Sequence, residues 1–133
     1  MIAVDASAVV AFFLHEEGWE KLAEYMRETV SLDLVVKEFY NAVWRAVRLH
    51  RRLSPDDAEK ALTLFRKYID GNMLLRNELD YVDKGFRIAL DEGITVYDAL
   101  YIALALEEST PLLTLDNRQR HIAQKYGIAV LPP

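Results

Sequence analysis

Short apolar runs that each give way to an acidic residue and then to a helical pattern constrain the fold of this chain more than any other feature. In I-A-V-D-A-S, Asp5 follows the run Ile2–Val4, and in P-L-L-T-L-D-N, Asp116 follows the run Leu112–Leu115. Strands that alternate with helices are typical of a parallel sheet covered by helices on both faces. In such an α/β fold, the C-terminal ends of the strands and the N-termini of the following helices lie at one edge, where ligands bind. We therefore expect both acids at that edge.

Two further acids fall at similar points of the pattern. Glu38 lies in the first turn of a helix that we expect after a strand at Leu32–Val35, and Asp98 lies in the first turn of a helical segment at Thr95–Leu106. Since all four acids are predicted near strand ends or helix starts, residues more than a hundred positions apart are expected to converge on one patch.

The rest of the chain continues the alternation. Helical patterns occur near 6–14, 36–47, 53–69, 81–90 and 117–126, with a helical turn at 19–26, a short strand at 73–75 and a last strand at 128–131. The part from about 53 to 90 is almost wholly helical, and we interpret it as an excursion from the sheet edge. The strand at 73–75 is the weakest of these predictions, because Gly71 and Asn72 precede it.

Composition limits the class of protein. The chain has 133 residues, of which 52% are apolar, and this predicts a single domain over 1–133 with a true core. There is no cysteine, so disulfides and thiolate metal sites are excluded. The N-terminus lacks a basic region and no apolar run approaches the ~20 residues of a membrane span, which makes a cytoplasmic location the default expectation. The net charge of −5 argues against a protein that coats nucleic acids but leaves a nuclease possible.

Each acid, taken alone, has an ordinary structural explanation. Asp5 and Asp116 are well placed as N-caps, Glu38 is favoured by the helix dipole, and Thr95-x-x-Asp98 matches a capping box. The set of four is harder to explain in this way, because Ser, Thr and Asn cap helices as readily and do not repel one another. Four carboxylates without cysteine form a site for Mg²⁺ or Mn²⁺. Such ions activate water for attack on phosphodiesters.

Four segments, in order, resemble the PIN domain family, and in particular the VapC-type toxins of prokaryotic toxin–antitoxin pairs: I-A-V-D-A-S, V-x-K-E-F-x-N-A-V, Y-D-A-L-Y-I-A-L-A and L-L-T-L-D-N-R. The resemblance covers the whole chain. It implies a three-layer fold with a five-stranded parallel sheet between helices, and a metal-dependent ribonuclease that uses Mg²⁺ or Mn²⁺. It also implies a homodimer and a small antitoxin as partners, in addition to an RNA substrate.

The resemblance also implies roles for single residues. Asp5, Asp98 and Asp116 are expected to bind the metal directly or through water, and Glu38 is expected to bind the metal or orient the attacking water. Three polar residues match the supporting positions of the family site, namely Ser7, Asn41 and Thr114.

Three arginines follow Glu38 on the same side of its predicted helix, opposite the apolar stripe. Arg45, Arg48 and Arg52 form either a solvated charged face or a basic track that leads RNA phosphates toward Glu38. Both interpretations stay open at the level of sequence.

Three other functions compete with a toxin ribonuclease. A PIN nuclease that processes RNA without being a toxin has the same site and differs in lacking a neighbouring antitoxin gene. A PIN scaffold that only binds partners is disfavoured by the intact acids. A phosphoaspartyl enzyme or receiver domain that uses Asp5 fits less well, because D-A-S lacks the second acid such sites carry near the first strand.

Overall fold

The computed structural model describes all residues 1–133 and contains one five-stranded parallel sheet with the strand order β3-β2-β1-β4-β5. The predicted parallel α/β architecture is therefore confirmed. The strands are β1 (Ile2–Val4), β2 (Thr29–Leu32), β3 (Met73–Arg76), β4 (Leu112–Leu113) and β5 (Val130–Leu131).

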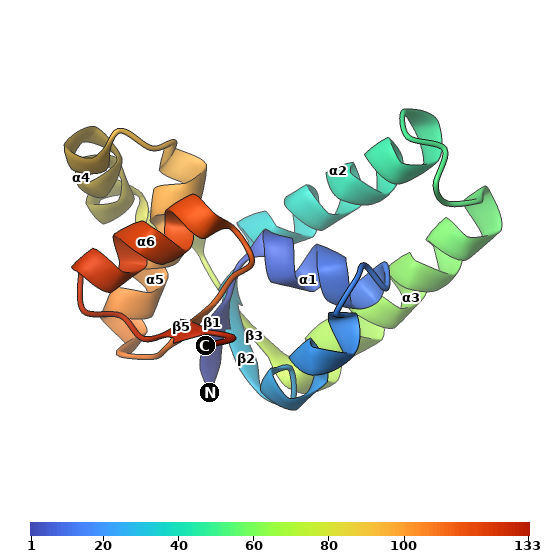
Figure 1. The fold of residues 1–133 in the computed structure, drawn as a ribbon, viewed down its shortest axis with the longest axis horizontal. Coiled ribbons are helices and arrows are strands. Elements are labelled where there is room, and N and C mark those ends of the chain that lie inside the picture. The colour runs from blue at the N-terminus through green and yellow to red at the C-terminus, as the bar shows by residue number, and fades with distance from the viewer.

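Six α-helices cover the two faces of the sheet, with α1, α2 and α3 on one side and α4, α5 and α6 on the other (Figure 1). Their bounds are α1 (Ala6–Phe13), α2 (Leu34–Arg48), α3 (Pro55–Asn72), α4 (Val82–Glu92), α5 (Val96–Glu108) and α6 (Asn117–Lys125), and two 3-10 helices, η1 (Trp19–Tyr25) and η2 (Glu78–Asp80), complete the fold. Helices α2 and α3 extend away from the sheet and approach each other at the turn that joins them, and α1 packs against both (Figure 1). No helix is long and apolar enough to span a lipid bilayer.

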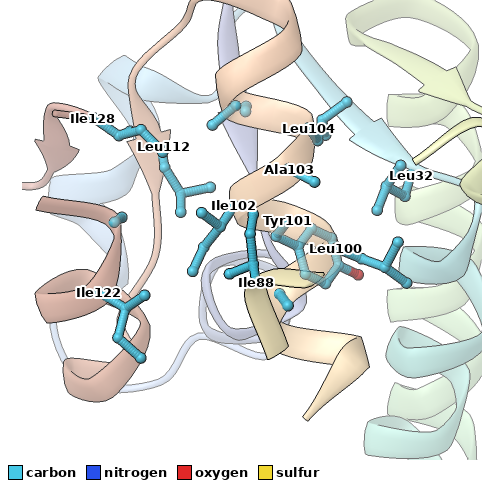
Figure 2. Packing of buried hydrophobic residues seen from close by; sticks show 14 of the residues in the cluster. Leu32, Ile88, Leu100, Tyr101, Ile102, Ala103, Leu104, Leu112, Ile122 and Ile128 are labelled. Carbon is cyan, nitrogen blue, oxygen red and sulfur yellow. The ribbon is translucent and has the colours of Figure 1, made fainter. Parts of the chain in front are cut away.

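Alternate strand residues supply the two halves of the core. Ala3 and Leu112 pack into the cluster beneath α4, α5 and α6, whereas Val4 and Leu113 pack into the cluster beneath α1, α2 and α3. This follows from the period of two in a strand, which sends neighbouring side chains to opposite faces. Figure 2 shows the first cluster gathered around α5. From Ala99 to Ala105, α5 is buried between the sheet and its neighbours.

One predicted element was wrong. The strand expected at 32–35 lies at Thr29–Leu32, and Leu34 already begins α2. The run T-V-S-L-D-L-V-V is apolar on both sides of Asp33, and a buried strand and the buried first turn of a helix look alike in periodicity. The boundary is set by tertiary contacts: Asp33 Oδ1 accepts a hydrogen bond from the backbone N–H of Glu78 at 3.0 Å.

The order of the strands places a topological switch point between β1 and β4. The chain leaves β1 for β2 on one side, while β4 and β5 are added on the other side. In open α/β sheets the connections diverge at this point, which leaves a crevice at the C-terminal ends of the strands. Asp5 directly follows β1 and Thr114 directly follows β4, so both lie at the crevice.

Candidate active site

Asp5 is the most buried acid of the site, with 4% of its surface exposed. Its carboxylate accepts hydrogen bonds from the Thr114 hydroxyl at 2.6 Å, the Ser7 hydroxyl at 2.7 Å and the Ala8 backbone N–H at 3.1 Å. Burial raises the pKa of Asp5 to about 6, although these hydrogen bonds act in the opposite direction, and the charge of Asp116 adds to the increase. Asp5 therefore caps α1 and also holds a carboxylate in the crevice.

The two hydroxyls that hold Asp5 are themselves held by the loop after β4. The Ser7 hydroxyl accepts from the backbone N–H of Leu115 at 2.9 Å, and the Thr114 hydroxyl accepts from that of Asp116 at 3.1 Å. Each hydroxyl thus accepts one bond and donates its single proton to Asp5. The network ties the ends of β1 and β4 together and holds Ser7 and Thr114 against the Asp5 carboxylate.

Asp116 caps α6, since its carboxylate accepts from the backbone N–H of Gln119 at 2.8 Å. The side chain of Gln119 is buried, and its amide Nε2 donates to the backbone carbonyl of Asp98 at 2.9 Å. Gln119 therefore fixes the start of α6 against the first turn of α5. Gln119 was not among the residues predicted for the site, although Asp116-x-x-Gln119 has the spacing of a capping box.

Asp98 and Glu38 are half-buried and face the same region from α5 and α2. Burial raises the pKa of Asp98, and the charge of Asp116 raises it further. Burial also raises the pKa of Glu38, against the effect of a hydrogen bond donated by the Tyr101 hydroxyl, and the charge of Asp98 adds to the rise. The electrostatic influence of Asp116 on Asp5 and Asp98, and of Asp98 on Glu38, links all four predicted acids into one group.

Tyr101 is a second residue that the sequence analysis missed. It is 2% exposed, and its hydroxyl reaches from α5 to Glu38 Oε1 on α2. Figure 2 shows its ring among the aliphatic side chains around α5. The only signal in the sequence is that Tyr101 lies one turn after Asp98 in an otherwise apolar helix.

Two shallow cavities adjoin Glu38, the one acid of the four that lines them. The first, of about 390 Å³, is lined by Ser7, Glu38, Asn41 and Arg45 among others, and the second, of about 440 Å³, is lined by Leu34, Lys37, Glu38, Asn41 and Tyr97. Asn41 is exposed and faces both cavities together with Glu38.

The predicted basic residues separate into two places. Arg45 lines the first cavity beside the acids, whereas Arg48 and Arg52 line a third hollow of about 580 Å³ at the turn between α2 and α3. Arg51 lines the same hollow. Arg52 also approaches Glu16, with 3.9 Å between Arg52 Nη2 and Glu16 Oε2.

Comparison with known proteins agrees with the fold and the order of the motifs. Residues 2–125 match the PIN domain. The chain belongs to the PIN domain family. It is 33% identical to a protein named Ribonuclease VapC3 from Pyrobaculum aerophilum, over 98% of both chains. It is 31% identical to Exonuclease VapC9 of the same organism, over 85% of this chain and 78% of that one.

A solved structure supports the same assignment. The crystal structure of PAE2754 from Pyrobaculum aerophilum superposes with a TM-score of 0.74 and 26% identity, and the alignment covers 98% of this chain and 88% of that one.

The acids of this PIN domain suit a hard cation by their chemistry. No three acidic or histidine side chains lie close enough together to enclose a metal ion by themselves. Mg²⁺ does not need such an enclosure, because it keeps several waters and is commonly held by one or two carboxylates together with substrate phosphate. Four electrostatically linked carboxylates with hydroxyl neighbours, and without sulfur or imidazole, fit this kind of ion.

Proposed function

We propose that this chain is a single PIN domain over residues 1–133 that cleaves RNA internally with the help of Mg²⁺ or Mn²⁺. The observation that carries the proposal is the convergence of Asp5, Glu38, Asp98 and Asp116 at the switch point between β1 and β4. The similarity to Ribonuclease VapC3 over 98% of the chain supports RNA as the substrate.

In this mechanism the residues hold and orient the reacting groups. When bound, the metal lowers the pKa of the attacking water and stabilises charge on the phosphate. Asp5, Asp98 and Asp116 would hold the ion, directly or through water, and Ser7 and Thr114 fix the Asp5 carboxylate by donating to it. Glu38, oriented by the Tyr101 hydroxyl, would align the attacking water or help to hold the ion. Asn41 and Arg45 line the same cavity as Glu38 and would contact the substrate there.

Internal cleavage is favoured by the shape of the site. The names of the two relatives do not decide this point, since ribonuclease covers both internal and terminal cleavage and only the second relative is called an exonuclease. Glu38 and Asn41 face cavities on both of their sides. A polynucleotide that enters from one cavity therefore has a place to continue in the other, whereas an exonuclease needs a wall that stops the chain end.

We further propose that the protein is the toxin of a cytoplasmic toxin–antitoxin pair and forms a homodimer. The VapC names of both relatives support this role. Three apolar side chains left exposed near α4 offer a surface for the second copy: Leu79, Phe86 and Leu90, at 71%, 52% and 67% exposure. A nuclease that processes RNA without an antitoxin is the alternative, and a small neighbouring antitoxin gene distinguishes the two.

The nuclease proposal is tested with linear and covalently closed circular RNAs in the presence of Mg²⁺, Mn²⁺ or EDTA. Wild type is expected to cut circular RNA with either metal and not with EDTA. Asp5→Asn and Asp98→Asn are expected to lose turnover at least a hundredfold while remaining folded, because they keep shape but lose the charge that holds the ion. Asp91→Asn, which changes an exposed carboxylate on α4, serves as the matched control and should keep full activity.

A second measurement does not depend on turnover. Mn²⁺ is expected to raise the melting temperature of wild type, because an ion that binds only the folded state stabilises it, and to raise that of Asp5→Asn less. Wild-type cleavage rates in both Asp→Asn site variants, or full activity in EDTA, would contradict the assignment of the acids. Cleavage of linear RNA only would contradict the internal cut.

A further inference from the structure

Tyr97 stands apart from the other aromatic residues near the site. Its side chain is 61% exposed, although it lies next to Asp98 at the start of the buried helix α5. It takes part in no side-chain hydrogen bond and packs against no other aromatic ring. It lines the second cavity, together with Lys37, Glu38 and Asn41. The fold therefore places a free aromatic face in the cavity beside Glu38, on the residue that precedes Asp98 in the sequence.

We propose that Tyr97 stacks on an unpaired base of the nucleotide next to the scissile phosphate, so that the enzyme selects RNA whose bases are unpaired at the cut. This inference rests on the proposed nuclease function and adds a specificity-determining residue to it. A base stacked on an aromatic side chain contributes about 1–3 kcal/mol, whatever its identity, since every base has a π-face. In a duplex both faces of the base are covered by its neighbours, so Tyr97 has nothing to stack on.

The charges around the two cavities suit a strand that passes over Glu38. Lys37 lies beside Tyr97, and its side chain is 73% exposed with one distant partner, Glu78, at 3.9 Å. An exposed pair of this length contributes little, so Lys37 is free to bind a phosphate. Arg45 lies in the first cavity and forms no ion pair. One cation on each side of Glu38 holds the phosphates that flank the cut.

Because Tyr97 makes no hydrogen bond or aromatic contact within the protein, substitutions at this position are expected to leave the stability of the fold unchanged. Tyr101, one turn later, is buried and holds Glu38, whereas Tyr97 holds no other residue. Trp44 provides a matched control, because it is 53% exposed on the same helix as Glu38 but lines neither cavity beside the acids. Tyr97→Phe keeps the aromatic face and Tyr97→Ala removes it.

The experiment pairs protein variants with two versions of one single-stranded RNA, identical except that the second carries an abasic ribose next to the mapped cut. Tyr97→Ala is expected to lower kcat/KM on the intact RNA about 5- to 150-fold, as expected for the loss of one stacked base. Tyr97→Phe and Trp44→Ala should stay near wild type. On the abasic RNA, kcat/KM of wild type should fall by the same factor, and kcat/KM of Tyr97→Ala should not fall further. Each change removes the same contact, so the two effects do not add. In the Asp5→Asn background, which removes turnover, the Kd should change in the same ratio.

Several results would overturn the inference. If Tyr97→Ala and the abasic ribose have effects that multiply, the ring and the base do not contact each other. If Tyr97→Ala weakens cleavage of every RNA equally and alters sedimentation of the protein, the ring belongs to an interface between copies. A wild-type protein that cuts intact and abasic RNA at one rate would overturn this inference and leave the nuclease proposal standing. A wild-type protein that cuts no RNA would overturn both.

Discussion

At the scale of single residues, Asp5 shows how one side chain serves the fold and the site together. It caps α1 by accepting from the Ala8 N–H, and it presents a buried carboxylate to the crevice. An Asn at this position would cap the helix as well but would meet the Ser7 and Thr114 hydroxyls with an amide that bears no charge. Asp5 can therefore serve both as a helix cap and as a catalytic residue. Only the catalytic role requires a charge, and burying that charge has a cost in stability that an Asn cap would avoid.

That cost predicts a pH dependence of stability in the absence of metal. Burial raises the pKa of Asp5 from 3.8 to about 6, so between pH 4 and 6 the folded state holds more protons than the unfolded state. The free energy of unfolding then falls as pH rises through this window. At pH 7 it is about 3 kcal/mol lower than it would be if the pKa of Asp5 were the same in both states. In EDTA, the free energy of unfolding of wild type relative to Asp5→Asn is expected to increase by about 1 kcal/mol from pH 7 to pH 5.

Urea unfolding of both proteins at the two pH values measures this difference. The variant does not titrate at position 5, so any effect common to the other acids cancels. A difference between the two proteins that is flat in pH would show that Asp5 is charged in the metal-free fold at both values.

The residues of the site fall into two groups: those whose position a local sequence pattern predicts, and those whose role depends on tertiary packing. Asp5, Ser7, Thr114 and Asp116 follow strands directly, so their approach could be predicted from the alternation of strands and helices. Tyr101 and Gln119 act across 63 and 21 residues of sequence, on Glu38 and on the Asp98 carbonyl. Their roles depend on how α5 packs against α2 and α6, which no local pattern contains.

At the scale of elements, the sequence predicted most helices to within a few residues but misplaced β2. The helices were recognisable because most carry one apolar stripe, whereas α1 and α5 are apolar nearly all round, and because several have a cap, such as Ser54 before Pro55 on α3. The start of α2 was not recognisable, because the apolar run continues through the strand–helix boundary at Asp33. Boundaries inside such runs are decided by pairing with neighbouring strands, here by β2 against β1 and β3.

Two helical glycines give opposite predictions for stability. A Cβ on Gly85 of α4 would lie 3.2 Å from Leu100 Cδ2 and 3.4 Å from Leu100 Cα, whereas a Cβ on Gly71 of α3 meets nothing within 4 Å. Gly71→Ala is expected to raise the free energy of unfolding by about 0.5 kcal/mol, because alanine favours helix. Gly85→Val is expected to lower it by about 1–3 kcal/mol, because the larger side chain overpacks the contact of α4 with α5.

Chemical denaturation of the two variants beside wild type checks this pair. The free energy of unfolding of Gly85→Ala should lie between those of Gly71→Ala and Gly85→Val, since one methyl group needs only a small shift of Leu100. Equal effects of valine and alanine at position 85 would mean that α4 moves away from α5 at little cost.

At the scale of the whole molecule, the charges are unevenly distributed. The chain carries a net charge of −5, yet the stretch between Glu38 and Asp56 contains four arginines and no acid. This basic segment leads along the exposed end of α2 to the turn before α3, beside an acidic crevice. An RNA strand therefore meets cations before it reaches the carboxylates, which need bound metal to accept its phosphates.

The same uneven charge predicts how an antitoxin would inhibit the enzyme. A partner segment with an arginine suits the acidic crevice, because a guanidinium pairs with two carboxylate oxygens at once, and its presence would exclude both metal and phosphate. Glu38→Gln is expected to weaken antitoxin binding about 10- to 100-fold, as for a lost hydrogen bond to a charged group. Asp91→Asn, which changes an exposed carboxylate on α4 that lines neither cavity beside Glu38, should leave affinity unchanged. Co-expression with the small neighbouring open reading frame, followed by affinity measurement on purified partners, tests this.

A captured partner that binds wild type and Glu38→Gln with the same affinity would mean that it covers another surface. Failure to capture any partner would contradict the toxin assignment while leaving the nuclease site intact.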